Sequence, residues 1–66
     1  MPPHTQAWRV AHATGCRYTD ARIAINLLVN RTGMTLDDAA DKAEAWARDG
    51  RNPALEAQAF LRGNQR

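Results

Sequence analysis

The fold is decided by residues 33–50, GMTLDDAADKAEAWARDG, which contain the signals that begin and end a helix. Gly33 and Gly50 are of the residue type that most often ends helices in the left-handed conformation. Thr35 is a preferred N-cap, and acids follow it in the first turn, where the helix dipole favours negative charge. Small apolar residues recur at helical spacing, on Leu36, Ala39, Ala40, Ala43, Trp46 and Ala47. The segment therefore predicts an amphipathic helix over 35–49.

The same types of helix-start and helix-end residue recur in the rest of the chain. Gly15 and Gly63 predict two further helix ends, and Thr19 and Asn52 are expected N-caps. Pro53 follows Asn52 at the first helical position, which proline tolerates best. No segment shows the alternation of a strand. We expect an all-α protein, a compact bundle of three to four short helices in one domain over 1–66, with helices near 5–14, 19–31, 35–49 and 52–62.

The helix expected over 19–31 is the most apolar of the four. Apolar residues cover about two thirds of its circumference, and its polar strip consists of Arg22, Asn26 and Asn30. That is more apolar surface than two neighbouring helices can easily cover in so short a chain, so the sequence predicts a homodimer. The two terminal helices are expected to pack through Ala7, Trp8, Val10 and Ala11, and through Leu55, Ala59, Phe60 and Leu61.

The residues that usually carry catalysis are scarce. The chain has no serine, two histidines, one cysteine and no glycine-rich phosphate loop. We therefore expect no enzyme activity, no cofactor and no metal site. Cys16 cannot form a disulfide within the chain and is expected to be mostly buried and unreactive. The acids of the helix over 35–49 are expected to form a solvated face.

Positive charge is concentrated in the first half of the chain. The net charge is +2, but residues 1–33 carry four arginines against the single acid Asp20, whereas residues 34–66 carry five bases and six acids. A basic surface favours a polyanionic partner. We expect nucleic-acid binding, with RNA ahead of DNA, through phosphate contacts by Arg9, Arg17, Arg22 and Arg31, base-edge contacts by Asn26 or Asn30, and stacking by Tyr18.

The expected location is the cytoplasm. Met1-Pro2-Pro3-His4 provides neither a basic start nor an apolar run of the kind that directs secretion. No stretch approaches the roughly 20 apolar residues of a membrane span.

Residues 24–61 carry a pattern that resembles the ANTAR domain, a helical RNA-binding module of bacterial transcription antiterminators. The matching residues are Ala24, Leu28, Val29, Arg31, Gly33, Thr35, Asp38, Ala39, Ala47, Leu55 and Ala59. The resemblance implies RNA binding in gene regulation. At positions tied to RNA contact in that family, this chain has Ile25-Asn26 in place of Lys-Gly, and Ala40 in place of an aromatic residue.

Two other resemblances use an earlier window. One set of residues looks like the apolar frame of a helix-turn-helix: Val10, Ala11, Gly15, Cys16, Ala21, Ala24 and Ile25. That motif would present Arg17, Tyr18, Arg22 and Asn26 to DNA. The same part of the chain is also similar to the start of a ubiquitin-associated-type module, like the amino-terminal module of elongation factor Ts. The matching pairs are Thr14-Gly15, Asp20-Ala21 and Ala24-Ile25. That resemblance implies the alternative function, a protein-interaction module that acts through the apolar surface of the helix over 19–31.

Overall fold

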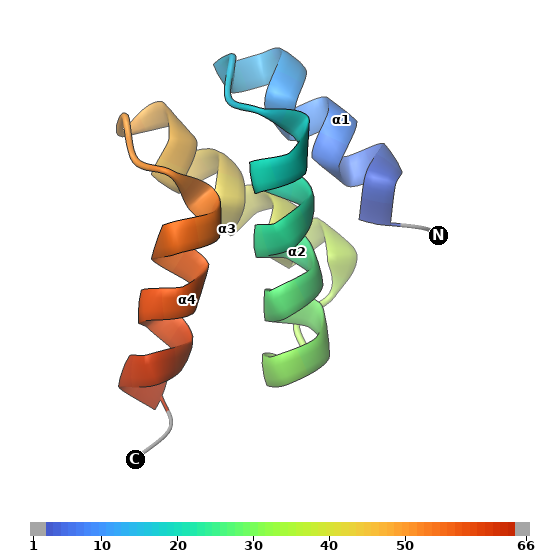
Figure 1. The fold of residues 1–66 in the computed structure, drawn as a ribbon. Coiled ribbons are helices and arrows are strands. Elements are labelled where there is room, and N and C mark those ends of the chain that lie inside the picture. The colour runs from blue at the N-terminus through green and yellow to red at the C-terminus, as the bar shows by residue number, and fades with distance from the viewer. Residues whose placement is uncertain (1–2, 65–66) are drawn as a thin grey trace.

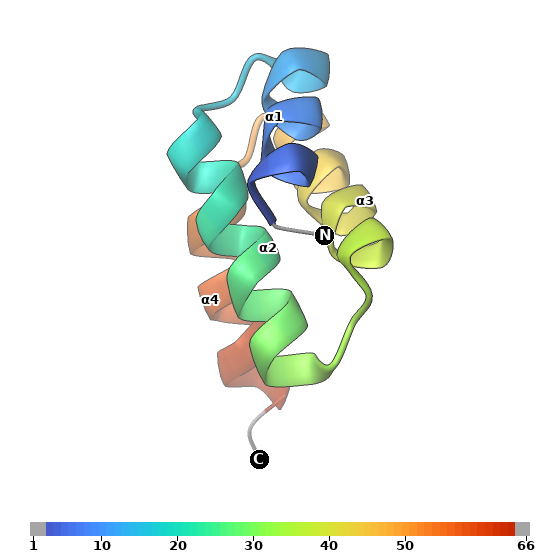
Figure 2. The same ribbon diagram turned by 90° about the vertical axis from the view of Figure 1, so that its right-hand side faces the viewer.

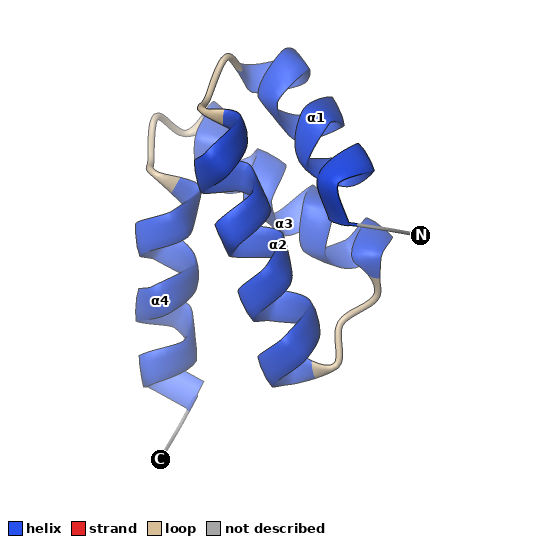
Figure 3. Ribbon diagram, turned by 45° about the vertical axis from the view of Figure 1, so that its right-hand side comes forward, coloured by secondary structure: helices blue, strands red, loops and turns tan. Residues whose placement is uncertain are grey.

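The computed structural model describes residues 3–64, and within them the chain is entirely helical with short connections (Figures 1 and 3). The four helices are α1 (Pro3–Thr14), α2 (Tyr18–Thr32), α3 (Leu36–Arg48) and α4 (Pro53–Asn64). The all-α fold class and the number of helices predicted from the sequence are confirmed. The first and last two residues of the single domain expected over 1–66 lie outside the described range.

The two middle helices form the centre of the bundle. Both α2 and α3 contact all three other helices, whereas α1 and α4 contact α2 and α3 but, within residues 3–64, not each other. Figure 2 shows α1 beside α3 and α2 beside α4. The helices α2 and α4 run side by side in the same direction (Figure 1).

Three neighbours therefore cover α2, where the sequence argument had assumed two. Of its apolar residues, Ala21, Ala24, Ile25 and Leu28 are buried, and Leu27 and Val29 pack against the core. The predicted homodimer rested on an excess of uncovered apolar surface on this helix. It stays a prediction, but without that argument.

Alanine dominates the core. It provides seven of the ten residues in the buried cluster, and the remaining three are Val10, Ile25 and Leu28. The stripe of Ala39, Ala40 and Ala43 predicted on the third helix is fully buried. Side chains this small let helix axes approach closely, so the bundle gains its packing from short interaxial distances rather than from large side chains.

Two of the predicted core faces each contain a large residue that is exposed. Trp8 is 54% exposed, because α1 turns a narrow stripe of Ala7 and Val10 inward and Trp8 lies about 100° away from Ala7. Leu55 is 62% exposed and Ala59 is exposed as well. Leu61 is buried and Phe60 packs against the core, as predicted, but the other buried residues of α4 are Pro53, Ala54 and Ala57. In α1 and at the start of α4 the inward positions are filled by small residues, so side-chain size misled the assignment of Trp8 and Leu55.

Most of the predicted helix ends are confirmed. Gly15, Gly33 and Gly50 all have φ near +75°, and the N-cap hydroxyl of Thr35 accepts a hydrogen bond from the amide of Asp38 at 3.1 Å. Asn52 caps α4, since its Oδ1 accepts from the amides of Ala54 and Leu55 at 2.9 and 3.2 Å.

Two assignments at helix ends are wrong. Gly63 lies inside α4 without a positive φ, because the helix continues to Asn64. Thr19 is not a cap, because α2 already begins at Tyr18, and its N-cap position is occupied by Arg17 without a side-chain hydrogen bond.

Candidate nucleic-acid interface

Three aromatic side chains gather where α1 ends and α2 begins. The ring centroids of Trp8 and Tyr18 are 5.6 Å apart with the planes tilted by 44°, and those of Trp8 and His12 are 5.3 Å apart with a tilt of 31°. Trp8 and His12 share one side of α1 because they are four residues apart. Tyr18 is partly buried, whereas Trp8 and His12 are exposed. Ring edges and faces are thus presented to solvent at this end of the bundle.

The turn between α1 and α2 is held by Thr14. Its hydroxyl donates to the carbonyl of Val10 at 2.8 Å and accepts from the amide of Cys16 at 3.3 Å. The amide of Gly15 bonds to the carbonyl of Ala11 at 2.8 Å, which closes the last turn of the helix. These bonds fix the short connection and with it the distance between Trp8 and Tyr18.

A notch of about 320 Å³ lies at this end of the molecule, lined by Trp8, Ala11, His12, Gly15, Cys16 and Tyr18. Most of the surface of Cys16 is buried, as expected from its place after a helix-ending glycine. The side chain packs against the core, and its remaining exposed part borders the notch.

Two of the predicted phosphate-binding arginines lie close to Tyr18 along the chain, although neither lines the notch itself. Arg17 directly precedes Tyr18 at the start of α2, and Arg22 follows Tyr18 by four residues, hence on the same side of the helix. Both side chains are exposed, and neither has an acid within ion-pair distance among the described residues. We call Trp8, His12, Arg17, Tyr18 and Arg22 together the α1–α2 corner.

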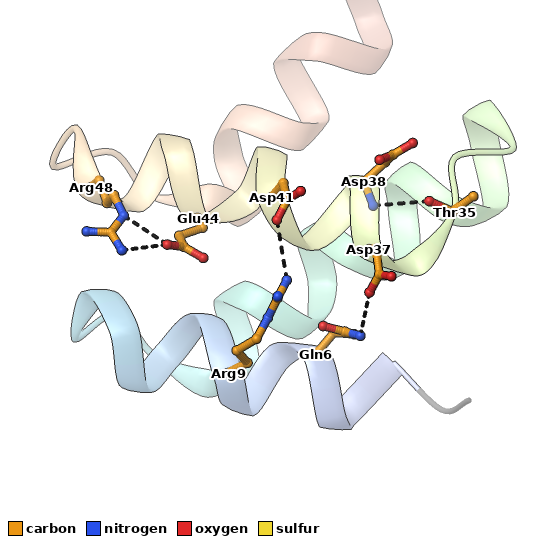
Figure 4. A network of polar contacts seen from close by, with 8 residues as sticks. All are labelled: Gln6, Arg9, Thr35, Asp37, Asp38, Asp41, Glu44 and Arg48. Atoms are coloured by element: carbon orange, nitrogen blue, oxygen red, sulfur yellow. Dashed lines mark hydrogen bonds and ion pairs between the residues drawn. The ribbon is translucent and has the colours of Figure 1, made fainter.

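Arg9 is directed elsewhere. Its Nη2 lies 3.5 Å from Oδ1 of Asp41 on α3, and one turn earlier Nε2 of Gln6 donates to Oδ1 of Asp37 at 2.9 Å (Figure 4). The expected solvated acidic face of α3 therefore also carries polar contacts to α1. Arg9 has its counter-charge within the protein, although an exposed pair of this length contributes little to stability.

The other predicted residues spread along α2. Asn26 is partly buried and lines a second depression with Thr19, Arg22 and Ile23, and Asn30 is exposed further along. Arg31 is exposed but nine residues beyond Arg22, which turns it about half a circle away. The structure thus brings Arg17, Tyr18 and Arg22 together and separates Arg9 and Arg31 from them.

Sequence reasoning placed Trp8 in the core and therefore missed its pairing with His12 on the surface. The available signal was their spacing of four residues on the side of α1 that Ala7 and Val10 leave uncovered. A large apolar residue such as tryptophan is usually assigned to the core, and this assumption led to the wrong prediction for Trp8.

Neither a metal site nor a membrane-spanning helix is present among the described residues. No group of three or more His, Cys, Asp or Glu side chains is arranged to hold a metal ion. In the same range, none of the helices has the length and apolar character needed to cross a membrane.

No protein-family model matches the chain, and comparisons with curated proteins and with solved structures gave no significant match either.

Proposed function

We propose that the chain is a small nucleic-acid-binding regulatory domain, with RNA favoured over DNA, and that it binds through the α1–α2 corner. The observation that carries this proposal is the exposed ring of Trp8 in contact with Tyr18, together with Arg17 and Arg22, which lie near Tyr18 along the chain and have no acidic partner among residues 3–64. Arginine next to an exposed aromatic ring is the combination that nucleic-acid-binding surfaces use for phosphates and bases.

Charge and shape support different parts of this proposal. Guanidinium groups pair with phosphate oxygens whatever the base sequence, so Arg17 and Arg22 supply affinity and salt dependence. The aromatic rings favour RNA, because its loops and bulges present unstacked bases for stacking. Asn26, which shares a depression with Arg22, is within the same region of α2 and suits a base edge.

The resemblance of residues 24–61 to the ANTAR pattern supports RNA as the ligand but not the same contact surface. Ile25 and Ala40, at positions tied to RNA contact in that family, are both fully buried here. RNA contact in this chain would use residues other than Ile25 and Ala40, and the α1–α2 corner lies entirely outside the matching segment.

The alternative is a protein-interaction module that uses the apolar surface of α2. One observation favours it: Ile23 is 42% exposed and lines the second depression with Thr19 and Asn26. Most of the apolar surface of α2 is covered by its neighbours, so the remaining area is small for a specific protein interface.

The test is a binding titration with labelled RNA and DNA at two salt concentrations. Arg17→Ala and Arg22→Ala should each weaken binding and make the slope of log affinity against log salt shallower by about one unit. Arg62→Ala is the matched control, since it removes the same charge from an exposed position on α4, which does not touch α1 in the described part of the chain. Binding that is equal in all variants, or absent in the parent, would overturn the proposal in favour of a protein partner.

A further inference from the structure

We infer that the notch at the α1–α2 corner receives a single unpaired nucleobase, so that the ligand is single-stranded rather than duplex nucleic acid. This inference rests on the proposed function and deepens it by naming the form of nucleic acid and the place of one base.

The shape of the notch suits one flat ring system. The notch is shallow and wide open to solvent, and its volume of about 320 Å³ lies at the lower end of the range for small-molecule pockets. Gly15 is one of its lining residues and has a φ of 76°, a conformation that favours glycine, so this part of the lining carries no side chain.

Trp8 offers an exposed apolar ring surface beside the notch. Trp8 contacts Tyr18 and His12 at tilted angles of 44° and 31° and keeps more than half of its surface in solvent. A base inserted beside it would cover that apolar surface and gain stacking, which every base offers through its π face.

Positive charge near Tyr18 suits the phosphates of a nucleic acid. Arg17 and Arg22 lie beside Tyr18 without an acidic partner among residues 3–64, so the phosphates on either side of an inserted base would meet positive charge. A base inside a duplex is paired and stacked and would first have to be extruded, at a cost of a few kcal/mol. A base in a single strand enters the notch without that cost.

The experiment compares a non-self-complementary RNA of about 12 nucleotides, the DNA of the same sequence, and the RNA annealed to its complement. Trp8→Ala should weaken binding of the single strands about tenfold, and Trp8→Phe should restore most of it, because phenylalanine keeps a stacking surface. Leu55→Ala is the matched control, an equally exposed apolar side chain on α4.

A second readout follows the notch directly. Cys16 borders it and is partly exposed, so a base in the notch should slow the modification of Cys16 by a soluble thiol reagent. We expect protection by the single-stranded RNA and none by the duplex at equal concentration.

The outcomes separate the two proposals. If the parent binds in a salt-dependent manner but Trp8→Ala binds as tightly and Cys16 is not protected, the notch is not the base site, while the proposed function stands. Tighter binding of the duplex than of the single strand would also overturn the inference. If the parent binds none of the three ligands, the proposed function fails, and the inference fails with it.

Discussion

Asn52 joins the start of α4 to the start of α2 by donating from its Nδ2 to Oδ2 of Asp20 at 3.2 Å. The same side chain caps α4 through its Oδ1, which accepts from the amides of Ala54 and Leu55. Asp20 lies in the first turn of α2, where a carboxylate also interacts favourably with the helix dipole. The side-chain amide of Asn52 thus caps α4 and also links the start of α4 to the start of α2.

Asn52→Ala should lower the free energy of unfolding by about 1–2 kcal/mol, since it removes both the cap and the link to Asp20. Urea denaturation followed by circular dichroism measures the change. Asn52→Asp keeps the cap oxygen but places a second carboxylate beside Asp20, so it should fall between the parent and Asn52→Ala. A stability of Asn52→Ala equal to that of the parent would show that neither bond contributes.

Ala40→Leu should destabilise the bundle by about 1–3 kcal/mol, because the core there is filled by small side chains and has no room for three more carbon atoms. The control is Ala45→Leu on the same helix, at an exposed position, which should change stability by less than about 0.5 kcal/mol. Thermal unfolding of the two variants tests the close approach of the helices. Equal stability of both would mean that the core tolerates expansion.

Lys42→Met should cost about 0.5–1 kcal/mol although it keeps an unbranched side chain of similar length. The Nζ of Lys42 lies 4.6 Å from the ring centroid of Phe60 and 5.3 Å from that of Trp46, so its charge interacts with rings from α3 and α4. Lys42→Arg keeps the cation and should stay close to the parent in chemical denaturation. A Met variant as stable as the parent would assign the contact to the aliphatic stem alone.

Arg22→Ala and Ile25→Asp should separate binding from folding within one helix. Arg22 is exposed, so its replacement should leave stability within about 0.5 kcal/mol of the parent. Ile25 is fully buried, and a carboxylate at that position should unfold the domain. Circular dichroism spectra of the two variants check this expectation. A folded Ile25→Asp protein would contradict the central position of α2.

Local signals in the sequence were sufficient for the existence of the helices and for most of their ends, Thr19 and Gly63 excepted. Thr35 and Asn52 act through hydrogen bonds to amides only two or three residues away, and the turn glycines act through their own φ, so each can be recognised without knowing the fold. The alanine stripe of α3 could be predicted in the same way, because charged residues lie on the opposite face of that helix.

The candidate site was less predictable, because it depends on which helices become neighbours. Tyr18, Arg17 and Arg22 were found from charge and residue type, but the partner of Tyr18 is a tryptophan ten residues earlier on another helix. Arg9 was included for its charge, and its contact with Asp41, 32 residues away, cannot be read from spacing within one helix. The outward position of Trp8 follows from the close packing of alanines elsewhere in the bundle.

Because α1 and α4 do not touch in the described part of the chain, a substitution in one of them reaches the other only through α2 or α3. Substitutions at the exposed positions of α1 and in the turn after it alter the notch without touching the residues that α4 buries. Substitutions towards the end of α4, away from the bond between Asn52 and Asp20, alter the stability of the bundle at a distance from every residue that lines the notch. During evolution, the ligand can therefore change through one helix and the stability through the other.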